Sequence, residues 1–194
     1  MARLFTAIEL TADVRESIVR NSASFVRDFH ADAARRLRRV RPEHLHVTLV
    51  FLGEIPETDI AAVTAAMTPP FSMEPFDITF ATAGTFPSRG PARVLWLGVG
   101  EGSDGCRRLH DEVAVRLASV GVQEEDRRFT AHLTLGRWPE RSGPFVHGGA
   151  RAIDGIPPLR VSGVTLFRSY LRPQGPEHTP LLVTPLAGRD GRLH

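Results

Sequence analysis

The sequence predicts an α+β fold with two lobes, in which each lobe is a largely antiparallel sheet with helices on its outer face and a central cleft separates the lobes. Strand-like and helix-like segments follow one another in the order β-α-β-α-β-β-α-β-β-β. This order divides into two similar halves, each with a strand, a helix and then a strand that carries His-x-Thr-Leu. The motif histidines, His46 and His132, are 86 positions apart, as an internal duplication would leave them. We therefore expect a single bilobal domain over residues 1–194, with its motifs at 46–49 and 132–135.

The first half begins with a strand and a helix. Apolar and polar residues alternate over 3–10, and apolar residues recur at helical spacing over 11–29. Thr11 or Asp13 suits the N-cap of that helix, and Gly53 closes the strand that carries the first motif. The expected elements are, in order, a strand at 3–10, a helix at 11–29, a strand at 45–52 and a helix at 57–67.

The second half contains the longest helical pattern. Cys106, Leu109 and Val113 recur at helical spacing, and Gly121 suits the C-cap. A Gly/Pro-rich loop at 84–91 separates two strands before this helix. The expected elements are strands at 76–81 and 93–99, a helix at 104–120, and strands at 132–138, 161–171 and 181–183.

Composition limits the cellular setting. One cysteine, Cys106, forms no intrachain disulfide and fits a reducing compartment. The sequence holds no apolar run of the roughly 18 residues that a membrane span needs, and its start lacks the pattern of a signal peptide. We expect a cytoplasmic monomer without a membrane partner.

Every basic residue is arginine, although the net charge is only +2. Arginine suits phosphate through its planar fork of donors, but a small net charge is a weak indication of nucleic-acid binding. The cluster at 35–39 could follow an RNA backbone; a solvated helix face or loop is the simpler interpretation.

The two motifs each offer an imidazole and a hydroxyl on one side of a strand. Residues i and i+2 of a strand point to the same face, so His46 accompanies Thr48, and His132 accompanies Thr134. If the two strands face each other across the cleft, all four side chains converge.

Such a group suits the opening of a cyclic phosphodiester. An attacking water must lose a proton, and the leaving sugar oxygen must gain one. Histidine performs either task near neutral pH, and each positioned imidazole contributes roughly 10²–10⁴-fold. Thr48 and Thr134 could donate hydrogen bonds to the non-bridging oxygens, where charge builds up. This chemistry needs no metal.

Segments across nearly the whole chain carry a family resemblance. His-Leu-His-Val-Thr-Leu-Val-Phe-Leu-Gly at 44–53 and Phe-Thr-Ala-His-Leu-Thr-Leu-Gly-Arg at 129–137 hold the two motifs. With them, the sequence resembles the bacterial and archaeal RNA 2′,3′-cyclic phosphodiesterases, also called 2′-5′ RNA ligases, of the two-histidine (2H) phosphoesterase superfamily. The other similar segments are 3–8, 84–87, 93–96 and 169–176.

The resemblance implies a fold, a reaction and site residues. It implies a bilobal protein without cofactor that hydrolyses 2′,3′-cyclic phosphates, on RNA ends or nucleotides, to 2′-phosphomonoesters, together with reversible 2′-5′ RNA ligation. It assigns proton donation to the leaving 3′ oxygen to His46 and activation of water to His132. Arg137 matches an arginine expected to contact phosphate or nucleobase. The sequence departs from the family at His178, where a tyrosine is usual.

Three alternatives stay open. A non-catalytic RNA- or nucleotide-binding module could keep the same cleft, although such a module has no need of two proton-transfer groups. His44, His46 and His132 could form a three-histidine metal site, which would leave the threonines without a role. The substrate could instead be a small nucleotide or an ADP-ribose cyclic phosphate, a choice that the cleft-lining loops make.

Overall fold

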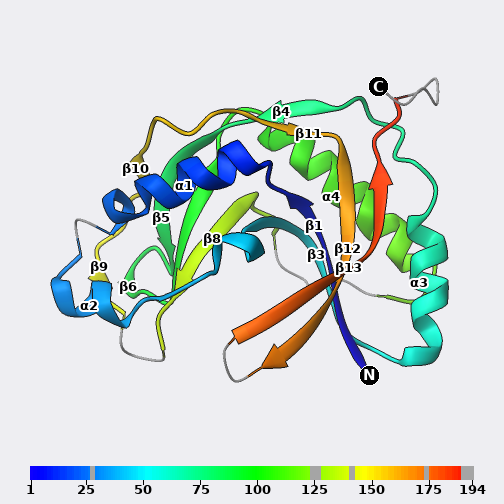
Figure 1. Cartoon of the computed structure of the whole chain (residues 1–194), viewed down its shortest axis with the longest axis horizontal. Coiled ribbons are helices and arrows are strands. Elements are labelled where there is room, and N and C mark those ends of the chain that lie inside the picture. Colours follow the sequence, from blue (N-terminus) through cyan, green and yellow to red (C-terminus); the bar gives the residue numbers. More distant parts are fainter. Residues whose placement is uncertain (27–28, 123–127, 140–142, 173–174, 189–194) are drawn as a thin grey trace.

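The computed structural model describes residues 1–26, 29–122, 128–139, 143–172 and 175–188, which form antiparallel sheets with few helices (Figure 1). The main sheet has nine strands in the order β10-β5-β7-β8-β3-β1-β12-β13, with β2 paired to β8 beside this path. Two-stranded sheets pair β11 with β4 and β6 with β9. The α+β class is confirmed. The strands are β1 (Ala2–Glu9), β2 (Arg38–Arg39), β3 (His46–Ile55), β4 (Phe76–Ile78), β5 (Phe80–Phe86), β6 (Gly90–Pro91), β7 (Val94–Val99), β8 (His132–Arg137), β9 (Phe145–Val146), β10 (Arg151–Ala152), β11 (Leu159–Val161), β12 (Gly163–Arg172) and β13 (Gly175–Pro185).

Two four-stranded groups of similar layout make up the main path. In one group, β3 is followed outward by β1, β12 and β13; in the other, β8 is followed by β7, β5 and β10. Their inner strands, β3 and β8, are the two motif strands, and they pair at Val47 and Leu133. The two expected antiparallel sheets are therefore present as halves that this pairing joins into one sheet.

The helices lie against one face of the sheet. They are α1 (Ala12–Phe25), α2 (Ala31–Arg36), α3 (Ile60–Met67) and α4 (Ser103–Ala118), with 3-10 turns η1 (Pro42–His44) and η2 (Glu57–Asp59). In Figure 1, α1 crosses β5, and α4 runs from beside β11 past β12 and β13 to α3; it contacts β3 and α3. Within the described ranges, no helix is long and apolar enough to span a membrane.

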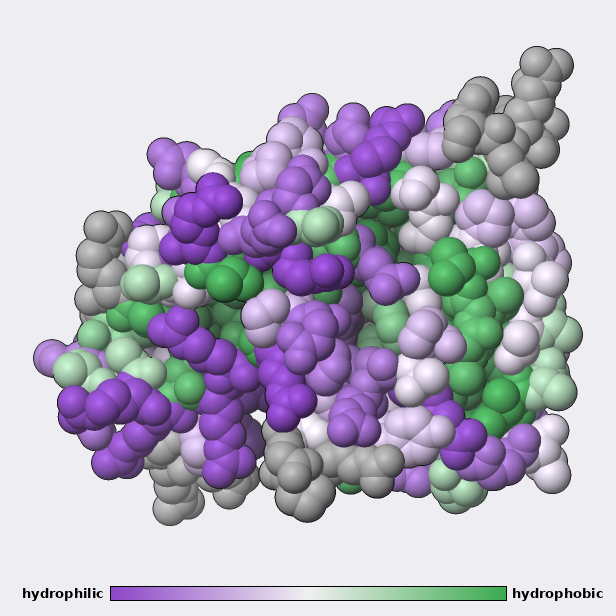
Figure 2. All heavy atoms as spheres, in the orientation of Figure 1, coloured by the Kyte–Doolittle hydropathy of each residue, from purple (hydrophilic) through white to green (hydrophobic). Residues whose placement is uncertain are grey.

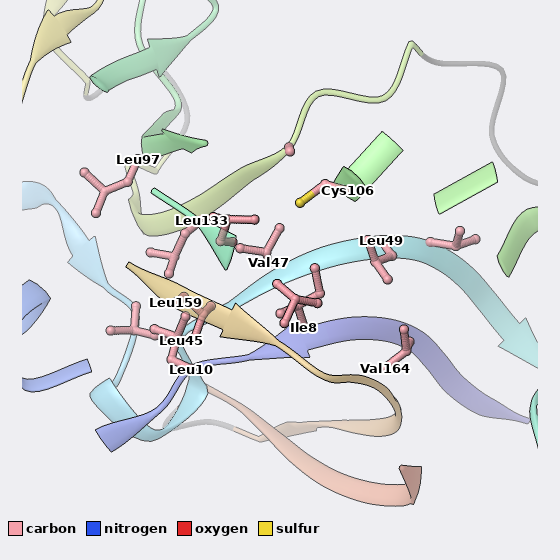
Figure 3. Packing of buried hydrophobic residues seen from close by; sticks show 14 of the residues in the cluster. Ile8, Leu10, Leu45, Val47, Leu49, Leu97, Cys106, Leu133, Leu159 and Val164 are labelled. Atoms are coloured by element: carbon pink, nitrogen blue, oxygen red, sulfur yellow. The ribbon is translucent and has the colours of Figure 1, made fainter. Parts of the chain in front are cut away.

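A continuous hydrophobic core fills the space between the helices and the sheet. Val47 and Leu133 are fully buried at its centre, and Cys106 of α4 belongs to the same cluster (Figure 3). Burying a Leu or Val side chain contributes about 1.5–3 kcal/mol. The same alternation turns the neighbours of Val47 and Leu133 toward the opposite face of the sheet, so core packing fixes the direction of the motif side chains.

The β12–β13 hairpin bends away from the sheet in its outer half (Figure 1). A register shift between Leu166 and Phe167 marks the bend. Beyond it, the ring of His178 lies 4.9 Å from the ring of Phe5, which belongs to β1. Arg168 forms an ion pair with Glu57 and ties the hairpin to η2. The bend thus carries the hairpin over the face that the helices leave uncovered.

The structure differs from the expected elements in several places, among them the loop expected at 84–91, of which 84–86 belong to β5 and 90–91 form β6. The expected helix at 11–29 ends at Phe25, and a separate short helix, α2, follows it. The strand expected to end at Gly53 continues to Ile55, because glycine accommodates the positive φ of 72° at that position. The arginines at 38–39 form strand β2, so the interpretation of this part of the cluster as a helix face or loop is wrong.

Candidate active site

The two motif strands bring all four polar motif residues together. Because Val47 pairs with Leu133 in an antiparallel register, His46 lies opposite Thr134, and Thr48 lies opposite His132. All four side chains are partly buried. The strands do not face each other across a cleft, as the sequence suggested; they are neighbours in one sheet. Convergence follows from strand pairing, at a spacing of about 5 Å.

Each motif histidine is fixed by a carbonyl two residues earlier in the chain. Nδ1 of His46 lies 2.7 Å from the carbonyl oxygen of His44, and Nδ1 of His132 lies 2.7 Å from that of Thr130. A carbonyl oxygen only accepts hydrogen bonds, so Nδ1 carries the hydrogen in both rings. Nε2 is therefore the nitrogen that each ring offers for proton transfer. The arrangement is the same at His46 and at His132.

Burial makes both histidines hard to protonate in the free protein. Desolvation is the main reason that the pKa of His46 is lowered to about 4, and charge repulsion by His178, His44 and His132 lowers it further. Desolvation also lowers the pKa of His132, with a contribution from the charge of Arg137. Both rings are therefore neutral near pH 7, and a bound anion would raise both pKa values.

Aromatic side chains flank both histidines. The ring centroid of Phe5 lies 4.9 Å from that of His46, and the centroid of Phe86 lies 5.1 Å from that of His132, with the two rings nearly perpendicular. Phe5 stacks on Phe167 at 5.1 Å, and these two residues belong to a small buried cluster separate from the main core. Apolar walls on both sides account for the desolvation of the imidazoles.

Trp96 lies beside this site on strand β7. It pairs with Thr134, and its ring covers two glycines: a Cβ at Gly84 would lie 2.5 Å from Cζ2 of the indole, and one at Gly98 would lie 2.9 Å from Cζ3. The indole occupies the room that side chains would take at both positions. No sequence pattern singles out this arrangement, and the glycines on two adjacent strands are the available signal.

His178 and His44 extend the site on the side of His46. The ring of His178 lies 4.9 Å from His44 and 5.6 Å from His46. Among the residues that the structure describes, no group of three or more His, Cys, Asp or Glu residues is placed to hold a metal ion. The three-histidine site of His44, His46 and His132 is therefore not assembled, and His44 contacts His178 instead.

Arg137 ends the second motif strand, and a bulge at Leu135, where the pairing with β7 shifts its register, turns it to the same face as His132. It lies opposite Arg38 of β2 and Val94 of β7. Its charge contributes to the lowered pKa of His132. Partial desolvation lowers the pKa of Arg137 itself, but an arginine stays charged at physiological pH.

Comparison with known proteins agrees with this geometry. Residues 18–173 match the model of the 2′-5′ RNA ligase superfamily. The RNA 2′,3′-cyclic phosphodiesterase of Archaeoglobus fulgidus is 32% identical over 183 residues, which cover 93% of this chain and 98% of the relative. The protein of the same name from Thermus thermophilus is 32% identical over 203 residues, covering 98% and 93%.

Solved structures extend the similarity to the fold. TT0787 of Thermus thermophilus superimposes with a TM-score of 0.79 at 29% identity, over 96% of this chain and 98% of that one. E. coli LigT in complex with 3′-AMP gives 0.74 at 28% identity, over 95% and 98%. The matched family model spans most of the chain, including both motif strands. The chain belongs to the 2′-5′ RNA ligase superfamily.

Proposed function

We propose that this chain hydrolyses 2′,3′-cyclic phosphates on RNA ends or nucleotides, giving a 2′-phosphomonoester and a free 3′-hydroxyl, without a metal ion or cofactor. The observation that carries the proposal is the pair of imidazoles whose Nδ1 atoms are both fixed by carbonyl oxygens. The names of the Archaeoglobus and Thermus relatives, and the 3′-AMP bound to LigT, support the same substrate class.

The reaction needs one proton transfer on each side of phosphorus. His132 accepts a proton from water as the water oxygen bonds to phosphorus, and His46 donates a proton to O3′ as the P–O3′ bond breaks. Thr48 and Thr134 donate hydrogen bonds to the non-bridging oxygens, which gain charge in the transition state. Arg137 holds the substrate through its phosphate or base. When the 5′-hydroxyl of a second RNA takes the place of water, the same two proton transfers form a 2′-5′ phosphodiester and a free 3′-hydroxyl, which is 2′-5′ RNA ligation.

His46 must be protonated to donate. Its pKa of about 4 in the free protein leaves little of that form at pH 7. The negative charge of a cyclic phosphate beside the ring favours the imidazolium and raises this pKa. The substrate itself therefore supplies the negative charge that stabilises the protonated form of His46.

The chain acts, in this proposal, as one bilobal domain and as a monomer. The core cluster draws side chains from both halves, which supports a single domain over residues 1–194. Both motifs lie on one chain, so the site needs no second copy. Size-exclusion chromatography with light scattering measures the molecular mass, which should be that of one chain.

The first test is turnover of 2′,3′-cyclic CMP in excess EDTA. The wild type should be active, while His46→Ala and His132→Ala should each lose about 10²–10⁴-fold in kcat, because each removes one proton transfer. His147→Ala, which removes an exposed histidine outside the motifs, serves as the control. ³¹P NMR identifies the product as the 2′-phosphomonoester.

Near-normal turnover by either motif variant would contradict the mechanism. Loss of wild-type activity on addition of EDTA would contradict the metal-free reaction. Tight binding of the cyclic nucleotide without turnover by folded wild type would favour the non-catalytic binding module.

A further inference from the structure

Strand β2 places a second arginine beside Arg137. Arg38 lies directly opposite Arg137 in the antiparallel pairing of β2 with β8. Residues directly opposite each other in such a pair point to the same face, with Cα atoms about 5 Å apart. Two guanidinium groups therefore extend from adjacent positions on one side of the sheet.

That side is the one that carries the motif histidines. Arg39, the next residue, donates a hydrogen bond from Nη1 to Oγ of Ser22 on α1, so it faces the helices. Alternation along the strand turns Arg38 to the other face. The register shift at Leu135 turns Arg137 to that face as well, while the next residue, Trp138, is buried in the core on the opposite side.

The fold leaves this pair of charges uncompensated. Within the described part of the chain, neither Arg38 nor Arg137 forms an ion pair, whereas the nearby Arg35 and Arg36 both pair with Asp32. Like charges opposite each other destabilise a strand pair. Hydrophilic residues gather around α2 and the segment that leads from it to η1 (Figure 2). An arrangement of this kind suits an anion that comes from outside.

The position of the pair identifies the class of anion. Arg137 lies three positions after Thr134 on β8, which separates their Cα atoms by up to about 10 Å. The cyclic phosphate between the motif residues is out of reach for Arg38, but a second phosphate on the same ligand is not. A planar guanidinium fork matches a phosphate group.

We propose that Arg38 and Arg137 bind the backbone phosphate on the 5′ side of the nucleotide that carries the cyclic phosphate, so that RNA ends are preferred over mononucleotides. This inference rests on the proposed function. The RNA strand leaves the motif residues along β8 and passes over β2. Arg38 is a specificity-determining residue, and it takes no part in proton transfer.

A pair of dinucleotides tests the proposal. Both end in a cytidine 2′,3′-cyclic phosphate and carry 2′-O-methyl on the upstream sugar; one has an ordinary linking phosphate, and the other has a neutral methylphosphonate. The measured quantity is the ratio of kcat/KM for the charged substrate to that for the neutral one. The wild type should give a ratio of about ten, because one charge-assisted contact is lost in the neutral substrate.

Arg38→Ala should bring this ratio close to one, Arg38→Lys should keep part of it, and Arg39→Ala should keep all of it. A wild-type ratio of one, or an unchanged ratio in Arg38→Ala, would overturn the proposal. A structural defect lowers both values of kcat/KM together and leaves the ratio unchanged. Turnover of 2′,3′-cyclic CMP by the same wild-type sample tests the proposed function separately, since it involves no linking phosphate.

Discussion

His46 lies in surroundings that keep its proton affinity low until a ligand binds. Burial against Phe5 and repulsion from His44, His178 and His132 lower its pKa to about 4. A cyclic phosphate adds a negative charge at the site, so the protonated form of His46 gains most when substrate is bound. The low pKa of the free residue is therefore compatible with a role as proton donor.

His178 offers a way to change this balance without touching the motifs. Its charged form repels a proton on His46, so His178→Gln should raise the pKa of His46 and move the bell-shaped pH profile of kcat/KM toward higher pH. The limbs of that profile belong to the coupled histidine pair. The measurement is kcat/KM between about pH 4.5 and 9, with His147→Gln as the control.

An unshifted profile in His178→Gln, together with normal stability, would show that His178 does not influence the pair. NMR titration of the His46 ring in the free protein gives a second measurement, in which its pKa should rise.

The residues that sequence reasoning identified are those that repeat. His46, Thr48, His132 and Thr134 stand out because an i, i+2 pattern occurs twice, and strand alternation is a local property. The ring of His178 reaches His46 only because the β12–β13 hairpin bends at a register shift. A contact of this kind depends on a distant backbone irregularity, which no local pattern reveals.

At the scale of elements, a clear apolar pattern decided what could be predicted; β13 is long but mostly exposed, and only 181–183 of it was expected. The strands at β1, β3, β7 and β8 are long enough to show alternation, and they were expected close to their observed positions. Strand β2 has two residues, which are too few to show an alternation of apolar and polar side chains. It forms a strand because β8 has a free edge beyond its contact with β3. The order of the strands in the sheet likewise depends on pairing between distant segments.

The position of the Trp96 indole on β7 depends on the neighbouring glycines, and a methyl group at one of them should disturb it. A Cβ at Gly98 would lie 2.6 Å from Oγ1 of Thr82 and 2.9 Å from Cζ3 of Trp96. Gly98→Ala should therefore push the indole away from the sheet and cost about 1–3 kcal/mol of unfolding free energy. Because Trp96 pairs with Thr134, kcat/KM should fall as well.

Urea unfolding and turnover of 2′,3′-cyclic CMP measure the two effects of Gly98→Ala. A variant with both values unchanged would show that the indole moves freely and that its place over the glycines is unimportant.

At the scale of the whole molecule, the site makes the fold sensitive to acid. Unfolding releases His46 to water, where its pKa returns to about 6.5. Between pH 6.5 and about 4, the unfolded chain binds a proton that the folded chain does not, so the free energy of unfolding falls as pH falls through this range. The lowered pKa values of His132 and His178 act in the same direction.

The pKa of His46 sets the size of this effect. A lowering from 6.5 to about 4 corresponds to about 3 kcal/mol at the acid end, at about 1.4 kcal/mol for each tenfold change in proton affinity. His46→Asn removes the titrating group, so the difference in unfolding free energy between pH 7.5 and pH 4.5 should be smaller in this variant than in the wild type. Urea unfolding at the two pH values measures it. Equal differences in the two proteins would mean that His46 takes up its proton as readily in the folded state as in water. The desolvation that lowers its pKa would then be absent.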